Sequence, residues 1–333
     1  SKQNQGATYD ITSHESTMKI LAMLALITES KALITLGRSP RVESMRQLKV
    51  FSERPVIMAE FARPPKSTMS GRNLCLEGDS EDQNIRYDFM FGEETANVLV
   101  LPYLYSPKNQ GMAAQVESWC RKTGATYVCA DYHGVSQDQN DVGTISRWVE
   151  DTIKLLDNVV SGKTIIVGAA VGAWVMLLVG MKRPDLVAGM VGVSCDPDFT
   201  EELLWRHLSE EDKNAIMTKG RHEITWGENK YQITKDLIVD GRENLVLQGG
   251  PRSLPITCPL RLIHGTDDEE VPLATALRIL EAVETDDVDV TVLKGMHHFI
   301  DDQKEFLTLR RQLDSVLKAA ELYEFDLRSP GSG

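Results

Sequence analysis

Apolar runs alternate with amphipathic segments from about residue 97 to residue 322. Strands are predicted at 97–101, 126–132, 164–168, 186–194, 259–265 and 288–293. Helices are predicted at about 110–122, 144–160, 172–182, 273–283 and 302–322. Uninterrupted Val, Ile and Leu runs flanked by helices are typical of strands that are covered on both faces. The pattern therefore predicts an α/β fold, a doubly wound and mostly parallel sheet with helices on both faces.

Two segments depart from this alternation. Residues 41–97 are polar and broken by prolines and glycines, and the short runs at 55–61 and 85–91 predict antiparallel strands. Residues 196–255 form a polar, Trp-bearing insertion after a central strand. Because α/β proteins bind ligands at the carboxyl ends of their strands, we expect this insertion to form a cap over the ligand crevice.

The chain divides into three predicted parts. Residues 1–53 form an N-terminal extension, in which Ile20, Leu21, Leu24 and Ile27 follow helical spacing and predict a helix that ends near Gly37. Residues 54–322 form the α/β domain, and 323–333 form a tail. The N-terminal helix either packs on its own domain or presents an apolar stripe to another protein subunit.

Composition and charge narrow the possible partners. Hydrophobic residues make up 42% of the chain and charged residues 26%, which is ordinary globular usage. The net charge of -13 argues against nucleic acid and anionic membranes as partners. The uncharged stretch at 20–28 is too short for a transmembrane segment. The five cysteines show no C-x-x-C spacing, so we expect neither a disulfide framework nor a metal site. We also expect no cofactor.

The run TIIVGAAVGAWVMLL at 164–178 has the layout of a nucleophile elbow. In α/β-hydrolases the motif G-x-S-x-G lifts a serine above the sheet on a strained strand-to-helix turn. Here Gly168 and Gly172 occupy the glycine positions, and Ala170 stands where the serine would be. The motif alone is weak evidence, because Gly-rich turns also bind phosphates.

Two later loops contain a candidate acid and a candidate base. LIHGTDDEEVP at 262–272 places Asp268 after a predicted strand, with Asp267 as the second choice, and VLKGMHHFI at 292–300 places His298 after the last strand. The order Ala170, Asp268, His298 is the chain order of a hydrolase triad. Asp268 could instead only cap the next helix, and His298 could be a structural loop histidine. The acidic run DDEE at 267–270 otherwise predicts a solvated face.

With these motifs on the runs 131–194 and 258–272, the chain resembles the mitochondrial α/β-hydrolases described as mycophenolic acid acyl-glucuronide esterase and palmitoyl-protein thioesterase. The resemblance covers roughly 97–322 and implies the α/β-hydrolase fold and a mitochondrial location. It also implies a Ser-Asp-His triad that cleaves esters and thioesters through an acyl-enzyme, with Asp268 as the acid, His298 as the base and Val171 in the oxyanion region.

Several positions depart from the family pattern. Ala170 has no hydroxyl to attack a carbonyl, and Tyr103 stands where such hydrolases carry a glycine that makes room for the oxyanion. Ser136 replaces a second glycine expected after Gly134, and Ala173 is the small residue that closes the elbow. These joint changes favour a catalytically inactive hydrolase-like protein that serves as a structural or accessory subunit of a larger mitochondrial assembly.

Three other interpretations stay open. The chain could be a serine esterase or thioesterase whose nucleophile was changed to alanine by engineering. It could be a binding module that holds a small acyl ligand in the former substrate cleft. The Asp268 and His298 pair could also act as a general base without a covalent intermediate.

Overall fold

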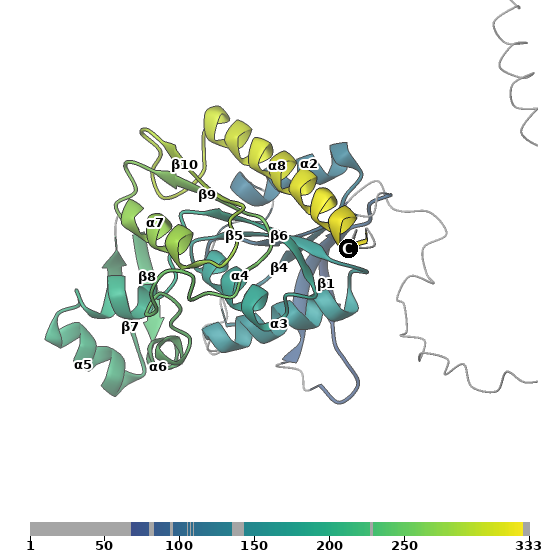
Figure 1. Ribbon diagram of the computed structural model, residues 1–333. Helices are drawn as coiled ribbons and strands as arrows, with labels where there is room; N and C mark the ends of the chain where they lie inside the picture. The colour runs from purple at the N-terminus through teal and green to yellow at the C-terminus, as the bar shows by residue number, and fades with distance from the viewer. Residues whose placement is uncertain are drawn as a thin grey trace, which may run out of the picture. The chain divides into compact units, whose positions relative to one another are not determined.

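The computed structural model describes residues 68–328 except 80–82, 94–95, 105, 107, 109, 135–142 and 227–228. Its central sheet has eight strands in the order β1-β2-β4-β3-β5-β6-β9-β10 (Figure 1). The strands are β1 (Met69–Leu74), β2 (Ile85–Met90), β3 (Asn97–Leu101), β4 (Thr126–Ala130), β5 (Thr164–Ala169), β6 (Val187–Val193), β9 (Leu260–Gly265) and β10 (Val288–Leu293). Pairing is parallel from β4 to β10, which confirms the predicted α/β fold.

The antiparallel edge of the sheet was only partly predictable. β2 pairs antiparallel with β4, as the run at 85–91 predicted, and β1 pairs antiparallel with β2. β1 was missed because MSGRNL is polar, contains a glycine and has an irregular register between Met69 and Arg72. The predicted strand at 55–61 and the predicted N-terminal helix lie outside the described residues.

Each inner strand sends alternate side chains into two separate cores. In β3, Leu99 and Leu101 enter one core, whereas Val98 and Val100 enter the other. Helices α3 (Ile145–Asn158), α4 (Val171–Lys182) and α7 (Leu273–Ala282) cover the first face of the sheet, and α2 (Gly111–Thr123) and α8 (Gln303–Arg328) cover the second (Figure 1). The period of two along a strand fixes this division. α8 continues to Arg328, beyond the predicted helix end at residue 322.

Helix α4 is enclosed on all sides. Its residues from Val171 to Gly180 are all buried, which explains why its sequence is apolar without amphipathic spacing. The indole nitrogen of Trp174 donates to the carbonyl of Asn244 at 3.0 Å, and the Trp174 ring contacts Phe199. α4 is therefore clamped between the sheet and the segment that follows β6.

That segment holds five elements between β6 and β9. They are a π-helix (Thr200–Trp205), α5 (Glu210–Lys219), the antiparallel hairpin of β7 (Arg221–Trp226) and β8 (Asn229–Thr234), and α6 (Lys235–Glu243). Asp198 adopts a positive φ of 63° and accepts hydrogen bonds from the backbone N–H groups of Val246 and Leu247 at 2.7 and 2.8 Å. The carboxylate thus ties the start of the segment to its end.

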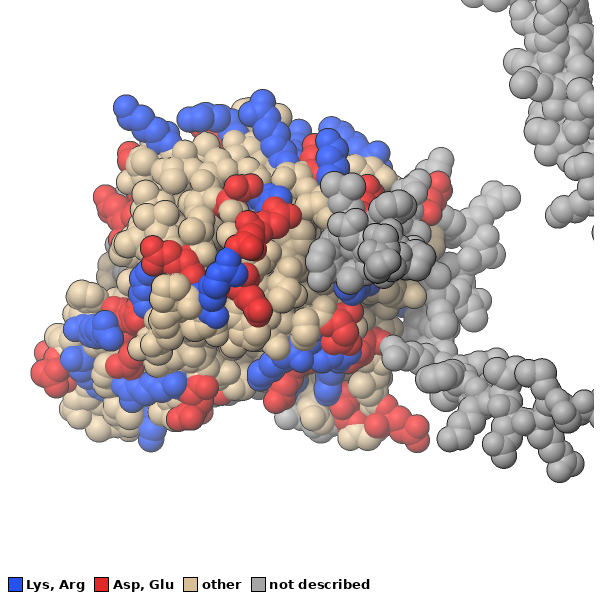
Figure 2. All heavy atoms as spheres, viewed as in Figure 1, with Lys and Arg blue, Asp and Glu red and all other residues tan. Residues whose placement is uncertain are grey.

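Charged side chains of both signs are interspersed over the face shown in Figure 2.

Among the described residues, no helix combines the length and the apolar character needed to cross a bilayer. The domain boundaries at residues 53 and 322 stay predictions.

Candidate functional site

The turn between β5 and α4 has the strained backbone of a nucleophile elbow. Ala170 adopts φ 48° and ψ −121°, a region that residues with a Cβ rarely occupy. The N–H of Ala170 donates to the carbonyl of Val193 at 3.0 Å, and its own carbonyl accepts from Ala173 at 2.9 Å. The elbow is therefore intact in its backbone, and only a methyl group stands at its tip.

The two elbow glycines are required by close packing. A Cβ on Gly172 would lie 2.2 Å from the carbonyl oxygen of Leu101, and a Cβ on Gly168 would lie 2.6 Å from the carbonyl oxygen of Gly172. No side chain fits at either position without moving the backbone. Val171 then opens α4, where the first N–H groups of a helix have no intrahelical partner.

Asp268 and His298 meet as the sequence predicted. Nδ1 of His298 lies 3.1 Å from Oδ2 and 3.2 Å from Oδ1 of Asp268. Oδ1 of Asp268 also accepts from the backbone N–H groups of Glu270 and Val271 at 3.0 and 2.9 Å. Asp268 therefore holds both the imidazole and its own loop. The alternative that it caps the next helix is wrong, because α7 begins after Pro272 with no side-chain cap.

The electrostatics around Asp268 favour its ionised form. Burial by itself would raise the pKa of Asp268, but the hydrogen bond and the charge of His298 and the N–H group of Val271 outweigh burial and lower that pKa. Nε2–H of His264 donates to the Val271 carbonyl at 2.9 Å, and burial lowers the pKa of His264. A buried, ionised carboxylate thus holds the imidazole of His298 from one side.

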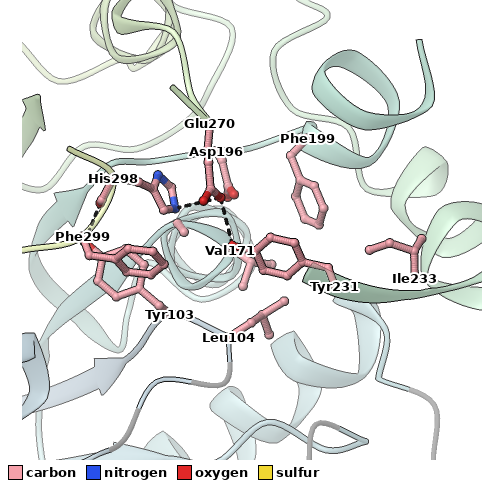
Figure 3. Close-up of a pocket in the computed structure, with 11 residues that line it drawn as sticks. Tyr103, Leu104, Val171, Asp196, Phe199, Tyr231, Ile233, Glu270, His298 and Phe299 are labelled. Atoms are coloured by element: carbon pink, nitrogen blue, oxygen red, sulfur yellow. Dashed lines mark hydrogen bonds and ion pairs between the residues drawn. The ribbon is translucent and has the colours of Figure 1, made fainter. Parts of the chain in front are cut away.

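The second imidazole nitrogen of His298 faces a carboxylate. Nε2 lies 3.8 Å from Oε2 of Glu270, and that oxygen accepts a hydrogen bond from the Tyr231 hydroxyl at 2.9 Å (Figure 3). Glu270 is only 8% exposed, so the prediction of a solvated face for DDEE is wrong at this position. Asp267 is exposed, whereas the side chain of Asp268 is fully buried, so Asp268 and not Asp267 is the partner of His298.

Tyr103 packs across the histidine loop. Its hydroxyl donates to the carbonyl of His298 at 3.1 Å, and its ring centroid lies 4.7 Å from that of Phe299 and 5.5 Å from that of His298. The Tyr103 side chain is buried. Gly134 has a positive φ of 73°, and Ser136 lies outside the described residues.

A cavity of about 30 Å³ lies above Ala170. Its walls come from the elbow, the loops after β3, β6, β9 and β10, and strand β8 (Figure 3). The lining residues are Tyr103, Leu104, Ala170, Val171, Asp196, Phe199, Tyr231, Ile233, Glu270, His298 and Phe299. Tyr231 and Ile233 belong to the segment after β6, so this segment closes over the elbow.

Asp196 is the most unusual residue of the cavity. It is 5% exposed, and its Oδ1 atom has no hydrogen-bond partner among the described residues. Burial raises the pKa of Asp196 well above its usual range, and the nearby charges of Glu270 and Asp268 raise it further. Two carboxyl groups, Asp196 and Glu270, thus share one small space.

The sequence reasoning did not single out Asp196, Phe199, Tyr231 or Glu270. A weak signal existed for Asp196, which comes three residues after the end of β6 at the carboxyl edge of the sheet. Tyr231 carried no such signal, since only the folding of β8 brings it to the elbow.

Among the described residues, no His, Cys, Asp or Glu side chains form a group of three that could hold a metal ion.

Comparison with known proteins places this geometry among hydrolases. No protein-family model matches the chain. Over 278 residues it is 27% identical to the mouse protein named palmitoyl-protein thioesterase ABHD10, mitochondrial, covering 80% of this chain and 92% of the mouse protein. The human protein of the same name is 27% identical over 243 residues, which is 70% of this chain and 76% of that protein.

Solved structures give the same result. The mouse alpha/beta hydrolase domain-containing protein 10 is 26% identical with a TM-score of 0.65, over 75% of this chain and 99% of that one. A putative hydrolase from Agrobacterium vitis S4 is 24% identical with a TM-score of 0.66, over 74% of this chain and 98% of that one. The predicted α/β-hydrolase fold and the predicted resemblance are confirmed. The names of the relatives also agree with the predicted mitochondrial location.

We expect Ala170→Gly to raise the free energy of unfolding by about 1 kcal/mol, because glycine adopts a positive φ without steric cost. Ala173→Gly is the matched control, since Ala173 is fully buried in the regular part of α4. There the same change should cost about 1 kcal/mol or more. Urea unfolding measures the free energy of unfolding of both variants. An equal loss of stability in the two would show that the backbone of the elbow is unstrained.

We expect Asp196→Asn to stabilise the protein more at high pH than at low pH. The pKa of Asp196 is raised on folding, so the folded state holds a proton that the unfolded state releases above about pH 4. The wild type therefore loses stability relative to the Asn variant as pH rises from there toward the folded pKa. Urea unfolding between about pH 4 and pH 8 tests this prediction. A difference in the free energy of unfolding between variant and wild type that stays constant over this range contradicts it.

Proposed function

We propose that this relative of the mitochondrial palmitoyl-protein thioesterases is a catalytically inactive α/β-hydrolase that works by binding, as a structural or accessory subunit of a mitochondrial assembly. Ala170 is the single observation that carries the proposal. Covalent acyl transfer needs a nucleophile with a lone pair at the tip of the elbow, and a methyl group has none. Loss of the triad serine leaves at most a residual acceleration of about 10³ to 10⁴-fold over water.

The environment of His298 supports the loss of acyl transfer. In a serine hydrolase Nε2 of the histidine takes the serine proton. Here that nitrogen lies 3.8 Å from the Glu270 carboxylate, which Tyr231 holds in place at 2.9 Å. A serine introduced at position 170 would have to compete with this carboxylate for the imidazole.

The room for a substrate supports the same proposal. A cavity of about 30 Å³ holds on the order of one water molecule, not an acyl ester. Tyr103 fills the oxyanion side and is anchored to the His298 carbonyl at 3.1 Å.

The α/β fold is retained although the elbow has no nucleophile, and this supports a role as a subunit of an assembly. The predicted partner is another protein subunit, contacted through the N-terminal extension at 1–53, which lies outside the described residues. Isolation of the full chain from mitochondria by native electrophoresis, followed by mass spectrometry, tests this role. Migration as a free monomer under native conditions would contradict it.

A serine esterase or thioesterase with an engineered alanine is the second candidate. Two observations favour it, the retained strain at Ala170 and the retained contact between Asp268 and His298. An acyl-binding module is the third candidate. A second cavity of about 470 Å³ favours it, because it adjoins the elbow cavity along Tyr103, Leu104, Tyr231 and Phe299.

Restoring the serine separates the first two candidates. We expect Ala170→Ser to hydrolyse p-nitrophenyl butyrate and S-acyl thioesters no faster than the wild type, because Glu270 and Tyr103 still obstruct the site. An active enzyme that has only lost its serine should instead gain about 10²-fold or more. The measurement is the initial rate at neutral pH.

The control for that experiment is Ala170→Ser combined with His298→Ala. A gain in the single variant that disappears in the double variant would identify a functional triad and overturn the proposal. A small gain that survives the loss of His298 would come from the hydroxyl alone, without triad catalysis, and would leave the proposal standing.

A further inference from the structure

Buried carboxyl groups gather around the elbow cavity. Asp196 and Glu270 line it and are 5% and 8% exposed. Asp268 lies directly behind His298, which is the single basic side chain among the lining residues. Burying carboxylates costs several kcal/mol unless a cation or hydrogen-bond donors compensate them. In the free protein Asp196 avoids this cost by keeping its proton, and a cation in the cavity would take the place of that proton.

One of these carboxyl groups has an oxygen without a partner. Oδ1 of Asp196 is buried and makes no hydrogen bond with any described residue. Figure 3 shows Asp196 and Glu270 together on one side of the cavity, facing the aromatic residues. Buried polar atoms are nearly always paired, so an orphaned oxygen on a side chain that lines a cavity indicates a donor that binds at this side chain.

The remaining walls of the cavity are aromatic. Tyr103, Phe199, Tyr231 and Phe299 all contribute to its lining. The face of an aromatic ring attracts cations through its quadrupole, and more strongly when water is excluded. Carboxylates on one side and aromatic rings on the others are the combination that recognises an organic ammonium group.

We propose that the cavity binds a primary alkylammonium group, whose N–H bonds are donated to the carboxylates of Asp196 and Glu270. The volume of about 30 Å³ suits an ammonium head, which is close to water in size. The alkyl tail extends toward the adjoining cavity of about 470 Å³, since Tyr103, Leu104, Tyr231 and Phe299 border both spaces. Because the described residues offer no group of three metal ligands, an ammonium fits this site better than a metal ion.

Two sources could supply this chemistry, a free alkyl diamine or the lysine side chain of another protein. Both present the same ammonium head on a chain of about four or five methylene groups. The proposal is independent of whether the protein catalyses acyl transfer, because no step of it uses Ala170 or needs His298 as a base. The test of alkylammonium binding can therefore fail while the proposed function stands. The proposed function can equally fail while the protein still binds an alkylammonium.

The experiment titrates the full chain with n-butylammonium chloride and follows binding by calorimetry and by the shift in Tm. The uncharged control ligand is n-butanol, which has a similar shape and no positive charge. The variants are Asp196→Asn and Glu270→Gln, and the matched control variant is Glu269→Gln, because Glu269 is the exposed neighbour of Glu270. Cadaverine and Nα-acetyl-lysine amide represent the two sources.

We expect n-butylammonium to bind saturably and raise Tm, whereas n-butanol does not. Each cavity variant should weaken binding by about 10-fold or more, the loss expected for one charge-assisted hydrogen bond. Glu269→Gln should bind like the wild type. Tighter binding of Nα-acetyl-lysine amide than of cadaverine would assign the site to a protein lysine, and the reverse order would assign it to a free diamine.

Equal responses to n-butylammonium and n-butanol would overturn the proposal, since the charge would then not matter. Wild-type affinity in folded Asp196→Asn or Glu270→Gln would overturn it as well, and so would an absence of binding at about 0.1 M ligand. Circular dichroism checks that each variant folds. If Asp196→Asn does not fold, Glu270→Gln alone decides between these outcomes.

Discussion

The close packing of α4 against the carboxyl ends of β3 and β5 determines the rest of the site. A Cβ on Gly172 would lie 2.2 Å from the Leu101 carbonyl oxygen, so the helix can approach the sheet only through glycine. The same closeness forces Ala170, at the tip of the turn, into a positive φ. The glycines are therefore needed for the fold, while the residue at position 170 is free to change with the chemistry.

The retained scaffold still brings an acid and a base together. The carboxyl ends of β9 and β10 lie side by side in the sheet, and the loops that follow them place Asp268 and His298 within 3.1 Å of each other. Around this pair, the Tyr103 hydroxyl donates to the His298 carbonyl, and the Glu270 carboxylate lies 3.8 Å from Nε2 of His298. Packing thus maintains the fold whatever residue stands at the tip of the elbow, and fold alone does not fix the reaction.

Sequence reasoning succeeded where the signal was local. Apolar runs predicted the parallel strands, and motif order predicted the meeting of Asp268 and His298. It failed for Glu270, which looks solvated within DDEE but is buried by Tyr231, a residue 39 positions away. It also missed β1, which has no apolar pattern and forms only because β2 offers it an edge. Such burial and pairing depend on tertiary neighbours that no short stretch of sequence contains.

The central claim is that the elbow presents no nucleophile to an acyl group. The most direct test is to incubate the wild-type protein with a fluorophosphonate, which reacts with activated serine, and to measure the intact mass. We expect the mass to stay unchanged, while an active serine hydrolase treated in parallel gains one adduct. A stoichiometric adduct on a residue that lines the elbow cavity would contradict the account.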